Sequence, residues 1–483
     1  MGASSIESSA LLYEGVADRI QALVARGALR PGARLPSVRA LAAREDVSVA
    51  TVVHAYTLLE SRGVIEARPQ SGHYVRRPAE APSPEPRACR PVRTASRITI
   101  DDQVASIYRT LADPSIVPLG IAIPSPALLP HQRLAALLGR VAREGGSRAV
   151  DYERPEGNLA LRRQIARRAA DAGVAARPED VIVTVGAMEA LHLALRATTK
   201  PGDTVAVEAP TYYGIWRMLA SLDLRAVEIP VHPSTGLDLA ALDAALRAHP
   251  IRACLATPSF NNPTGARMSD DAKAELVSLL ARHDVPLVED DIYGDLAFDG
   301  TRLRPAKAWD TRGQVLLCAS FSKTLAPGYR IGWVIPGARH DRVESLKFAQ
   351  SIATPTVTQL AVAAFLEDGG YARHLRRLRR ALADQVQAAT DCVVESFPAG
   401  TRVSRPGGGL VLWIELPGRV SGLALHEAAL ARRISVAPGP LFSSTASRFG
   451  GFIRISCGAP MTGETARAVR TLGALATELA ARS

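Results

Sequence analysis

In the first 75 residues, apolar side chains recur at helical spacing in three stretches and then in two short β-prone runs. The first stretch places five apolar residues on one helical face: Leu12, Val16, Ile20, Leu23 and Val24. The run PGARLP then breaks the pattern, and Ser37 and Ser48 stand where each can cap a following helix. Residues 64–75, VIEARPQSGHYV, are typical of a hairpin. Three helices and a hairpin predict a winged helix-turn-helix, whose third helix enters the major groove of DNA.

Beyond residue 101 the pattern changes to short, apolar, β-rich runs that alternate with longer helical stretches. Six such runs are bounded by turn residues: 181–185, 204–209, 253–258, 285–291, 315–320 and 330–335. Strands buried on both faces of a largely parallel sheet have this pattern, with helices between them. The sequence therefore predicts an α/β fold here, and ligands of such sheets bind beyond the carboxyl ends of the strands.

A proline- and arginine-rich segment separates the two patterns. Residues 76–97 contain five prolines and six arginines and few side chains that a core could bury. We therefore expect an extended, partly polyproline-like linker. The expected domains are a winged helix-turn-helix at residues 1–77, a linker at 78–100 and an α/β domain at 101–483.

Composition narrows the class of protein. The chain has 483 residues, 47% of them hydrophobic and 22% charged, which suits a globular protein with a large core. No apolar run approaches the length of a membrane span, and the N-terminus lacks the pattern of a secretory signal. The five cysteines are scattered without a Cys-x-x-Cys motif, which favours a reducing cytoplasm and argues against disulfides or a metal site. A net charge of +11 is compatible with a nucleic-acid partner but does not by itself indicate one.

Chemically informative residues follow five of the six runs. Gly186 to Glu189 open a helix after the first run, where backbone N–H groups favour an anion such as phosphate. The residues at or just after the ends of the other four runs are Tyr212, then Asn262, then Asp290 and Tyr293, and finally Ser320, Ser322 and Lys323. Because these strand ends are expected to meet, they converge on one site with an aromatic face, a carboxylate and an amine.

This set of groups fits pyridoxal 5′-phosphate (PLP). The cofactor needs an amine to hold its aldehyde as a Schiff base, a carboxylate to keep its pyridine nitrogen protonated, an aromatic platform and donors for its phosphate. An unpaired ammonium is costly in an apolar setting, so covalent use explains Lys323 within SFSKTLAPGYRIGW. Arg330 of the same run would pair with the phosphate, for which its planar fork is suited.

With these motifs the second region resembles the fold-type-I aminotransferases of class I and II, which carry a mostly parallel α/β/α sheet and a small C-terminal α+β part. The resemblance implies that Lys323 forms the Schiff base, that Asp290 pairs with the pyridine nitrogen and that Tyr212 stacks on the ring. It implies that Tyr293 and Asn262 donate to the ring O3′. The phosphate would be held by Ala187, Met188, Ser320, Ser322 and Arg330.

The same resemblance assigns two further residues. Tyr152, in DYERPEGNLALRRQIA, would enter the cofactor site of the neighbouring subunit, which implies a homodimer. Arg454, in GFIRISCG, would bind the α-carboxylate of a substrate or effector. Taken from the residues alone, Asp290 could equally belong to a solvated acidic turn, Tyr212 to core packing and Arg454 to a surface ion pair.

The first region resembles the GntR family of bacterial regulators in PGARLPSVRALA, VSVATVVHAYTLLESRG and VIEARPQSGHYV. The resemblance implies phosphate contacts from Arg34, Ser37 and Arg39 and base-edge contacts from Ser48, Val49 and Thr51. Residues Arg68 to Gly72 would form the wing. The alternative is that both serines only cap helices and that the arginines are merely solvated.

In this order, the two regions resemble the MocR subfamily of GntR regulators over essentially the whole chain. That implies a PLP-dependent, DNA-binding transcription regulator in the cytoplasm, which senses an amino acid, an amine or PLP itself through aldimine formation at Lys323. Its expected partners are double-stranded operator DNA, a small amino compound and a second copy of the chain, but no membrane. The alternatives are an active aminotransferase with a secondary DNA-binding module and a protein whose winged helix contacts protein instead of DNA.

Overall fold

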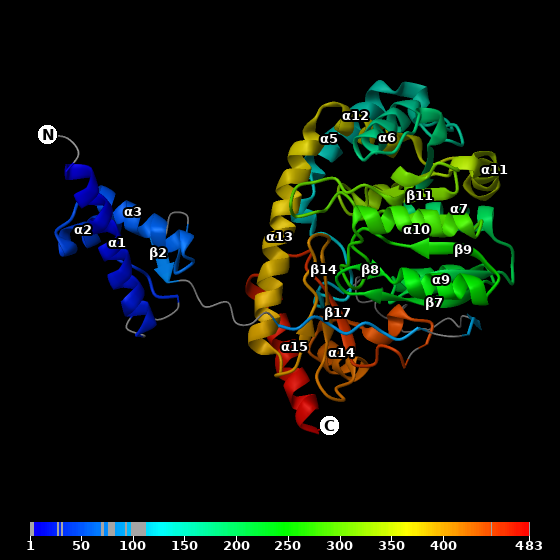
Figure 1. Cartoon of the computed structure of the whole chain (residues 1–483). Coiled ribbons are helices and arrows are strands. Elements are labelled where there is room, and N and C mark those ends of the chain that lie inside the picture. The colour runs from blue at the N-terminus through cyan, green and yellow to red at the C-terminus, as the bar shows by residue number, and fades with distance from the viewer. Residues whose placement is uncertain are drawn as a thin grey trace. The chain divides into compact units, whose positions relative to one another are not determined.

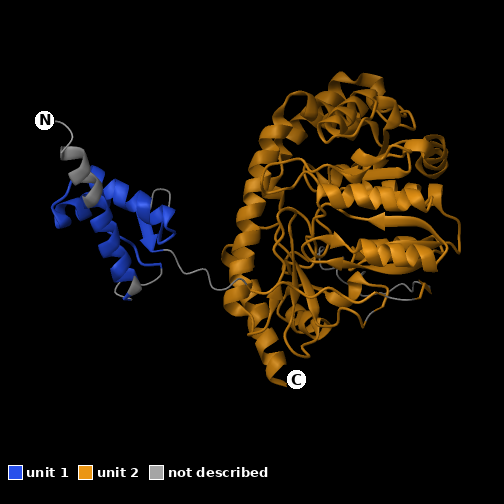
Figure 2. Cartoon of the chain, in the orientation of Figure 1, with its two compact units in different colours: residues 1–82 blue, residues 83–483 orange. Residues whose placement is uncertain are grey.

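The computed structural model describes residues 4–26, 29, 32–68, 72–75, 83–91, 94–97, 113–445 and 447–482. The chain forms two compact units, Met1–Pro82 and Ser83–Ser483, which Figure 2 shows in different colours. Among the described helices, none is long and apolar enough to cross a membrane.

Unit 1 contains the three helices and the hairpin that the apolar pattern predicts (Figure 1). The elements are α1 (Ser4–Ala25), α2 (Val38–Glu45), α3 (Val49–Ser61) and the antiparallel strands β1 (Ile65–Arg68) and β2 (Gly72–Val75). Val16 and Ile20 of α1 are buried against Val52 and Leu59 of α3, whereas Leu12 of the same predicted face is half exposed. The core of this unit is therefore built from the apolar faces of its helices.

Ser37 and Ser48 both cap helices of unit 1. The Ser37 Oγ accepts the backbone N–H of Ala40 at 3.2 Å, and the Ser48 Oγ accepts that of Thr51 at 3.1 Å. Each bond satisfies one of the N–H groups that a helix start leaves without an intrahelical partner. Between the two helices, Asp46 turns the chain in the left-handed conformation with a φ of 54°.

A mostly parallel sheet forms the centre of unit 2. Its strands follow the order β3 (Ser96–Arg97), β7 (Arg225–His232), β6 (Thr204–Ala209), β9 (Ile251–Ala256), β10 (Leu287–Asp290), β11 (Val315–Ser320), β12 (Ile331–Ile335) and β5 (Ile182–Val185), with β8 (Gly236–Leu237) beside β7. The ladder from β7 to β11 is parallel, while β12 is antiparallel to both β11 and β5. All six predicted runs are strands, and β7 is a further strand that the apolar pattern did not predict.

Helices cover both faces of this sheet (Figure 1). They are α7 (Ala187–Thr198), α8 (Tyr213–Ser221), α9 (Leu239–Ala248), α10 (Asp270–Arg282) and α11 (His340–Ser351). Since successive strand residues point to opposite faces, Val205 and Val207 pack in one cluster with α7 and α8, and Ala206 packs in another with α9 and α10. Because these strands are buried on both faces, their sequences are mostly apolar and do not alternate between apolar and polar residues.

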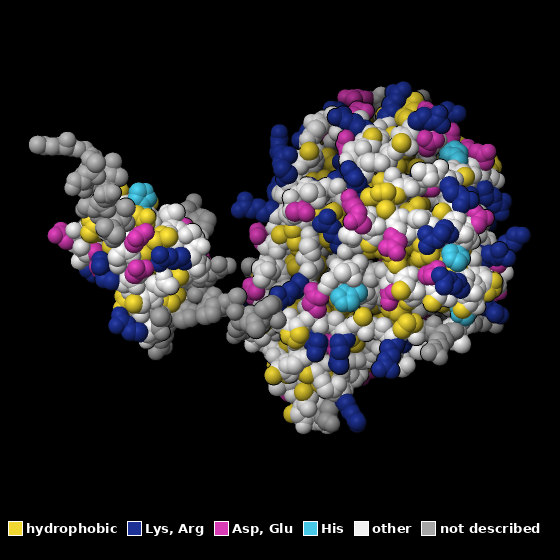
Figure 3. Space-filling model, in the orientation of Figure 1, with side chains coloured by type: hydrophobic (Ala, Val, Ile, Leu, Met, Phe, Trp, Pro, Cys, Tyr) yellow, Lys and Arg dark blue, Asp and Glu magenta, His cyan; other side chains and the backbone are white. Residues whose placement is uncertain are grey.

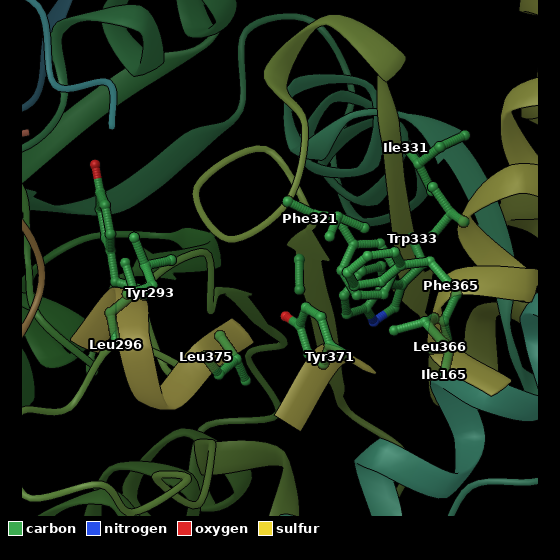
Figure 4. Packing of buried hydrophobic residues seen from close by; sticks show 14 of the residues in the cluster. Ile165, Tyr293, Leu296, Phe321, Ile331, Trp333, Phe365, Leu366, Tyr371 and Leu375 are labelled. Atoms are coloured by element: carbon green, nitrogen blue, oxygen red, sulfur yellow. The ribbon is translucent and has the colours of Figure 1, made fainter. Parts of the chain in front are cut away.

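An aromatic cluster lies beside the sheet, where it packs against α5 (His131–Glu144), α6 (Leu159–Asp171), α12 (Thr356–Glu367) and α13 (Gly370–Ser396). The rings of Phe321 and Trp333 lie 4.7 Å apart, and Tyr371 meets Phe321 edge to face. Figure 4 shows that the Tyr293 hydroxyl points away from these packed rings. The cluster fixes the chain on either side of Lys323, because Phe321 and Leu325 both belong to it.

The C-terminal part of unit 2 is smaller and antiparallel. Its sheet has the order β13 (Arg402–Val403), β14 (Val411–Glu415), β17 (Phe452–Ser456) and β16 (Ala437–Pro438), and it packs with α14 (Gly422–Ala431) and α15 (Gly463–Arg482). A short parallel pair, β4 (Val117–Pro118) with β15 (Ile434–Ser435), joins the residues before the large sheet to this part. That pair sets the position of residues 119–123 beside β17, because Leu119 O accepts the N–H of Ser456 at 2.8 Å.

Part of the expected linker is attached to unit 2. Residues 83–91, named here the docked segment, contact both parts of that unit. In the C-terminal part, the backbone N–H and Nε of Arg87 donate to Glu415 at 2.8 and 2.7 Å. At the large sheet, Cys89 Sγ donates to Ala209 O at 3.2 Å, and Arg448 donates to Arg90 O. Glu415 is buried, so pairing with Arg87 explains why this stretch is held against the protein. Residues 78–82, 92, 93 and 98–100 of the expected linker lie outside the described residues.

Candidate functional site

A cavity of about 240 Å³ lies where the strands of the large sheet end. It is lined by most of the unit 2 residues that were selected from the sequence: Ala187, Met188, Tyr212, Asn262, Asp290, Tyr293, Ser322, Lys323, Arg330 and Arg454. Ser320 lies just behind this lining, where its Oγ accepts the N–H of Ser322 at 3.3 Å. Residues far apart in the chain meet here because parallel strands bring their carboxyl ends to one edge of the sheet.

Lys323 follows β11 and has a weakly basic amine. Its Nζ donates to Ala122 O at 2.7 Å. Burial, together with the nearby Arg454 guanidinium, lowers the pKa of Lys323 to about 8, although Asp290 opposes the shift. A larger fraction of this amine is therefore neutral near pH 7 than of an ordinary lysine, and the neutral amine is the nucleophile.

Asp290 is the last residue of β10 and is 7% exposed. Burial, with a smaller effect from Asp291, raises the pKa of Asp290 to about 7, while a hydrogen bond from the N–H of Ile292 at 3.2 Å opposes the shift. A nearby cation would further stabilise this carboxyl group in its charged form. A protonated pyridine nitrogen is such a cation, so the surroundings of Asp290 fit the role that the sequence assigns to it.

The start of α7 and Arg330 form a cradle for an anion. Gly186 precedes the helix with a φ of 79° and offers no side chain to cap it, so the first N–H groups of α7 have no cap from that residue. A Cβ at position 186 would overlap the Arg330 guanidinium, and Arg330 Nη2 donates to Val185 O at 3.1 Å. N–H groups at a helix start and a guanidinium together suit a phosphate.

Glu208 supports the site, and sequence reasoning missed it. It is buried at the end of β6, where it accepts the N–H of Thr257 at 2.9 Å and the Nδ2 of Asn261 at 2.8 Å. These bonds hold the loop that carries Asn262 into the cavity. Burial raises the pKa of Glu208 to about 7. A glutamate inside the otherwise apolar run TVAVEA was the signal in the sequence that could have identified it.

Arg454 is the most unusual group at the cavity. It belongs to β17 and is 0% exposed. Its Nη2 donates to Gly120 O at 2.9 Å, and its guanidinium carbon lies 5.6 Å from the centre of the Phe442 ring. Its Nε and Nη1 have no hydrogen-bond partner among the described residues. A buried cation with two unsatisfied donors is costly, so a carboxylate is the natural complement of this group.

The residues expected to contact DNA divide into exposed and buried ones. Arg34, Ser37 and Arg39 are exposed, as are Ser48 and Val49 at the start of α3. Figure 3 shows Lys and Arg side chains on the visible faces of both units, without one dominant basic patch on that of unit 2. The exposed residues near the start of α3 are therefore a better guide to a DNA surface than overall charge.

Thr51 was expected to contact base edges, but it is only 6% exposed. Its Oγ1 lies 2.8 Å from Ser48 Oγ. Its hydroxyl is used inside unit 1, on the side of α3 that faces the core. Gly72 begins β2 with a φ of 106° next to the Arg34 side chain. The side chain of Arg68 and residues 69–71 of the expected wing lie outside the described residues.

Comparisons with known proteins identify the family of each unit and find relatives that contain both. The sequence pattern of the family "Aminotransferase class I and II" matches residues 114–471, and that of "Bacterial regulatory proteins, gntR family" matches residues 12–75. Two relatives from Escherichia coli K12, the uncharacterized HTH-type transcriptional regulators YdcR and YjiR, are each 39% identical. Their alignments cover 96% and 95% of this chain and 99% and 98% of those proteins.

The chain belongs to the MocR subfamily of GntR-type transcription regulators. The fold class and the cofactor predicted from the sequence are thereby confirmed: this MocR regulator joins a helix-turn-helix unit to a PLP-dependent, aminotransferase-like unit.

Solved structures agree with this fold. LysN, the α-aminoadipate aminotransferase of Thermus thermophilus in complex with N-(5′-phosphopyridoxyl)-L-leucine, has a TM-score of 0.73 at 29% identity. That alignment covers 80% of the MocR chain and 97% of LysN. The kynurenine aminotransferase of Pyrococcus horikoshii gives the same TM-score at 25% identity, over 79% of this chain and 95% of that enzyme. The MocR chain thus has a complete aminotransferase fold.

Tyr152 is the one predicted cofactor-site residue that lies away from the cavity of its own chain. It is 81% exposed, and the neighbouring Val150 is 88% exposed. In this MocR regulator the expected role of Tyr152 in a partner's site remains a prediction, as do the individual roles of the cavity residues.

Proposed function

We propose that this regulator changes its DNA binding when a small amino compound, or PLP itself, reacts at Lys323. One observation carries the proposal. Next to the weakly basic amine of Lys323 lies the buried Arg454, which has two donors without a partner among the described residues. An amine-reactive centre beside a carboxylate-binding cation fits an amino acid.

The cavity residues that were selected from the sequence would divide the binding of cofactor and ligand between them. Bound PLP would supply an aldehyde whose carbon exchanges the Lys323 amine for that of the ligand. Asp290 would hold a proton on the pyridine nitrogen, and Arg330 with the start of α7 would hold the phosphate. Tyr212 would support the ring, and Asn262 and Tyr293 would orient it. Arg454 would bind the carboxylate, which fixes the ligand at two points.

We propose that the regulator acts as a homodimer in the cytoplasm, where the DNA is. Val150 and Tyr152 expose apolar surface, as do Phe348 and Ile352, which are 57% and 45% exposed. A second copy would cover these side chains and receive Tyr152. A dimer would also present two helix-turn-helix units to two half-sites of an operator.

The docked segment offers a route from ligand to DNA-binding unit. It is bonded to Glu415 in the C-terminal part and to Ala209 at the end of β6, two residues before Thr211. Arg454 and Phe442 belong to the C-terminal part, and Phe442 O accepts the N–H of Thr211 at 3.0 Å. A ligand that draws Arg454 toward the large sheet would shift these contacts. It can change DNA binding only by as much as its affinity differs between the two arrangements.

A second function, turnover as an aminotransferase, is favoured by the same cavity, because Lys323, Asp290, Tyr212 and Arg454 all line it. The two functions predict different measurements. For a regulator, an amino acid alters the affinity for promoter-region DNA, and that affinity falls with salt. For an enzyme, an amino donor and a 2-oxo acid are converted over many turnovers.

The deciding experiment measures both activities on one preparation of the PLP-loaded protein. We expect salt-dependent DNA binding that responds to an amino compound, with turnover slow or absent. Rapid turnover together with DNA affinity that no amino compound changes would refute the regulatory proposal and support the enzyme.

A further inference from the structure

The charged side chains that line the cavity number four among the described residues: Asp290, Lys323, Arg330 and Arg454. In the proposed function Asp290 and Arg330 serve the cofactor, Lys323 is displaced by the ligand's amine and Arg454 binds its carboxylate. No charged group of this lining is left to pair with a ligand side chain. Such a side chain would meet apolar groups, among them Ile121, Ile123, Ile292 and Pro327.

The strip Gly120–Ile123 places the ligand against these isoleucines. Gly120 O accepts from Arg454 Nη2 at 2.9 Å, and Ala122 O accepts from Lys323 Nζ at 2.7 Å. Arg454 would bind the ligand's carboxylate, and Lys323 would exchange with its amine. These two side chains thus contact carbonyl groups that are two residues apart in the strip. If the ligand bridges these two side chains, its Cα, which joins the amine to the carboxylate, would lie near Ile121.

The strip has little freedom to move away. A Cβ at Gly120 would collide with Ser435, and a Cβ at Gly458 would collide with Ile123 O. Beyond the strip, Ser125 N–H donates to Gly458 O at 2.7 Å. Because backbone packs against backbone here, Ile121 and Ile123 form a preformed apolar wall.

We propose that the ligand is an α-amino acid with an uncharged, apolar side chain, for which leucine serves as the probe. The proposal rests on the proposed function, in which an amino compound binds between Lys323 and Arg454. A carboxylate or ammonium in the side chain would lose its water next to the isoleucines without gaining a partner. An apolar side chain buries its surface against them.

A neighbouring hollow could instead accept a charged ligand side chain. It shares Met188 and Tyr212 with the cavity and is also lined by Glu189 and Arg217. Glu189 already accepts from Val185 N–H at 2.6 Å and from Ser351 Oγ at 2.8 Å. The side chain of a dicarboxylic ligand that reached past Tyr212 would meet Arg217 in this hollow. Tighter binding of glutamate than of leucine would therefore indicate that the ligand side chain lies in the hollow, and it would overturn our proposal.

The test titrates PLP-loaded protein with L-leucine, L-alanine, L-glutamate, L-lysine and isoamylamine, which is leucine without its carboxylate. The visible absorbance of the bound cofactor and the affinity for a promoter-region DNA fragment are both recorded. We expect leucine to bind at least about tenfold more tightly than alanine, glutamate or lysine. Isoamylamine should bind about 100-fold more weakly than leucine, because it leaves Arg454 without a carboxylate.

Variants locate the effect. Ile123→Ala should weaken leucine binding about tenfold and leave alanine binding unchanged, and Ile121→Val should act in the same direction but less. Val394→Ala, at a partly exposed position on α13, is the matched control and should change neither affinity. The absorbance of the bound cofactor shows whether each variant is folded.

Two outcomes would overturn the proposal in different ways. Glutamate or lysine binding as tightly as leucine would refute the apolar ligand class and leave the proposed function intact. No response of either readout to any of the five compounds, from protein that carries PLP and binds DNA, would refute sensing of an amino compound at this site and the ligand class with it.

Discussion

The exposed arginines of unit 1 and the buried arginine of the cavity differ in their access to water. Arg34 and Arg39 are exposed, so water solvates their charges when no DNA is bound. Arg454 is fully buried, and two of its nitrogens have no partner among the described residues. A solvated charge costs the fold nothing and therefore says little about a partner. A buried charge with unsatisfied donors is costly, and this cost is the reason for our proposal that a carboxylate-bearing ligand binds there.

The largest expected effect is on the cofactor. Lys323→Ala should abolish covalent attachment of PLP, so that borohydride fixes no cofactor to the peptide that contains residue 323. Lys200→Ala is the control, because Lys200 is an exposed lysine of the same unit. DNA binding in the absence of ligand should persist in both variants, since it belongs to unit 1. Cofactor fixed to the Lys323→Ala protein would show that another lysine carries it.

Arg454→Met should separate ligand binding from stability. We expect the affinity for a carboxylate-bearing ligand to fall about 100-fold or more, because the variant has no cation there. The free energy of unfolding in urea should stay the same or rise by about 1 kcal/mol or more, since an apolar side chain replaces a poorly paired buried charge. A marked loss of stability would mean that Arg454 serves the fold and not a ligand.

The pH dependence of cofactor uptake should reflect the weakly basic amine. Burial and Arg454 lower the pKa of Lys323 to about 8, so the reactive neutral form is already dominant above pH 8. The rate at which the cofactor-free protein takes up PLP should rise about tenfold per pH unit below pH 8 and then level off. In Arg454→Met the levelling should move to higher pH, because one nearby positive charge is gone. An unbroken rise to pH 10 in both proteins would contradict this.

Arg39→Ala tests whether the exposed arginines of unit 1 contact DNA. We expect weaker DNA binding and a salt dependence that is lower by about one phosphate contact, with an unchanged cofactor spectrum. Arg62→Ala, which removes an ion pair to Asp18 on unit 1, is the matched control and should leave the salt dependence unaltered. Equal DNA affinity of the Arg39→Ala protein and the unaltered protein would show that the DNA surface lies elsewhere.

The smallest effect is expected for Arg87→Ala in the docked segment. It removes the side-chain partner of the buried Glu415. Ligand and DNA should each bind the variant nearly as before, but the ligand should change DNA affinity less, by a few-fold. Measuring DNA affinity with and without saturating ligand checks this. Full coupling in the variant would exclude the docked segment as the route.

The strands of the large sheet that are mostly apolar were predictable from the sequence, and β7 was not. The six predicted runs are rich in apolar residues because helices cover both sides of the sheet. β7 was missed because Glu228 and Pro230 interrupt its apolar pattern. Glu228 is nevertheless buried, and Ser443 and Arg448 pair with it from more than 200 positions away in the chain. Such distant pairing is invisible to a local pattern.

The site shows the same division. Lys323, Asp290 and Asn262 could be placed together from the sequence, because each lies at or after the carboxyl end of a strand of one parallel sheet. Glu208 could not be assigned a role, because its partners Thr257 and Asn261 come from another loop. In unit 1, Thr51 was expected to face DNA but is buried, because the helical position decides which way a side chain points.

The sequence by itself determined which chemical groups this protein has: a helix-turn-helix unit, an amine and a carboxylate at the ends of strands, and two guanidinium groups. Local spacing and side-chain chemistry carry that information. Only the tertiary structure decided which charges find partners, since Arg454 reaches Gly120 across 334 positions and leaves two donors unsatisfied among the described residues. The pairing of a buried charge depends on every segment packed around it, and no stretch of sequence specifies that alone.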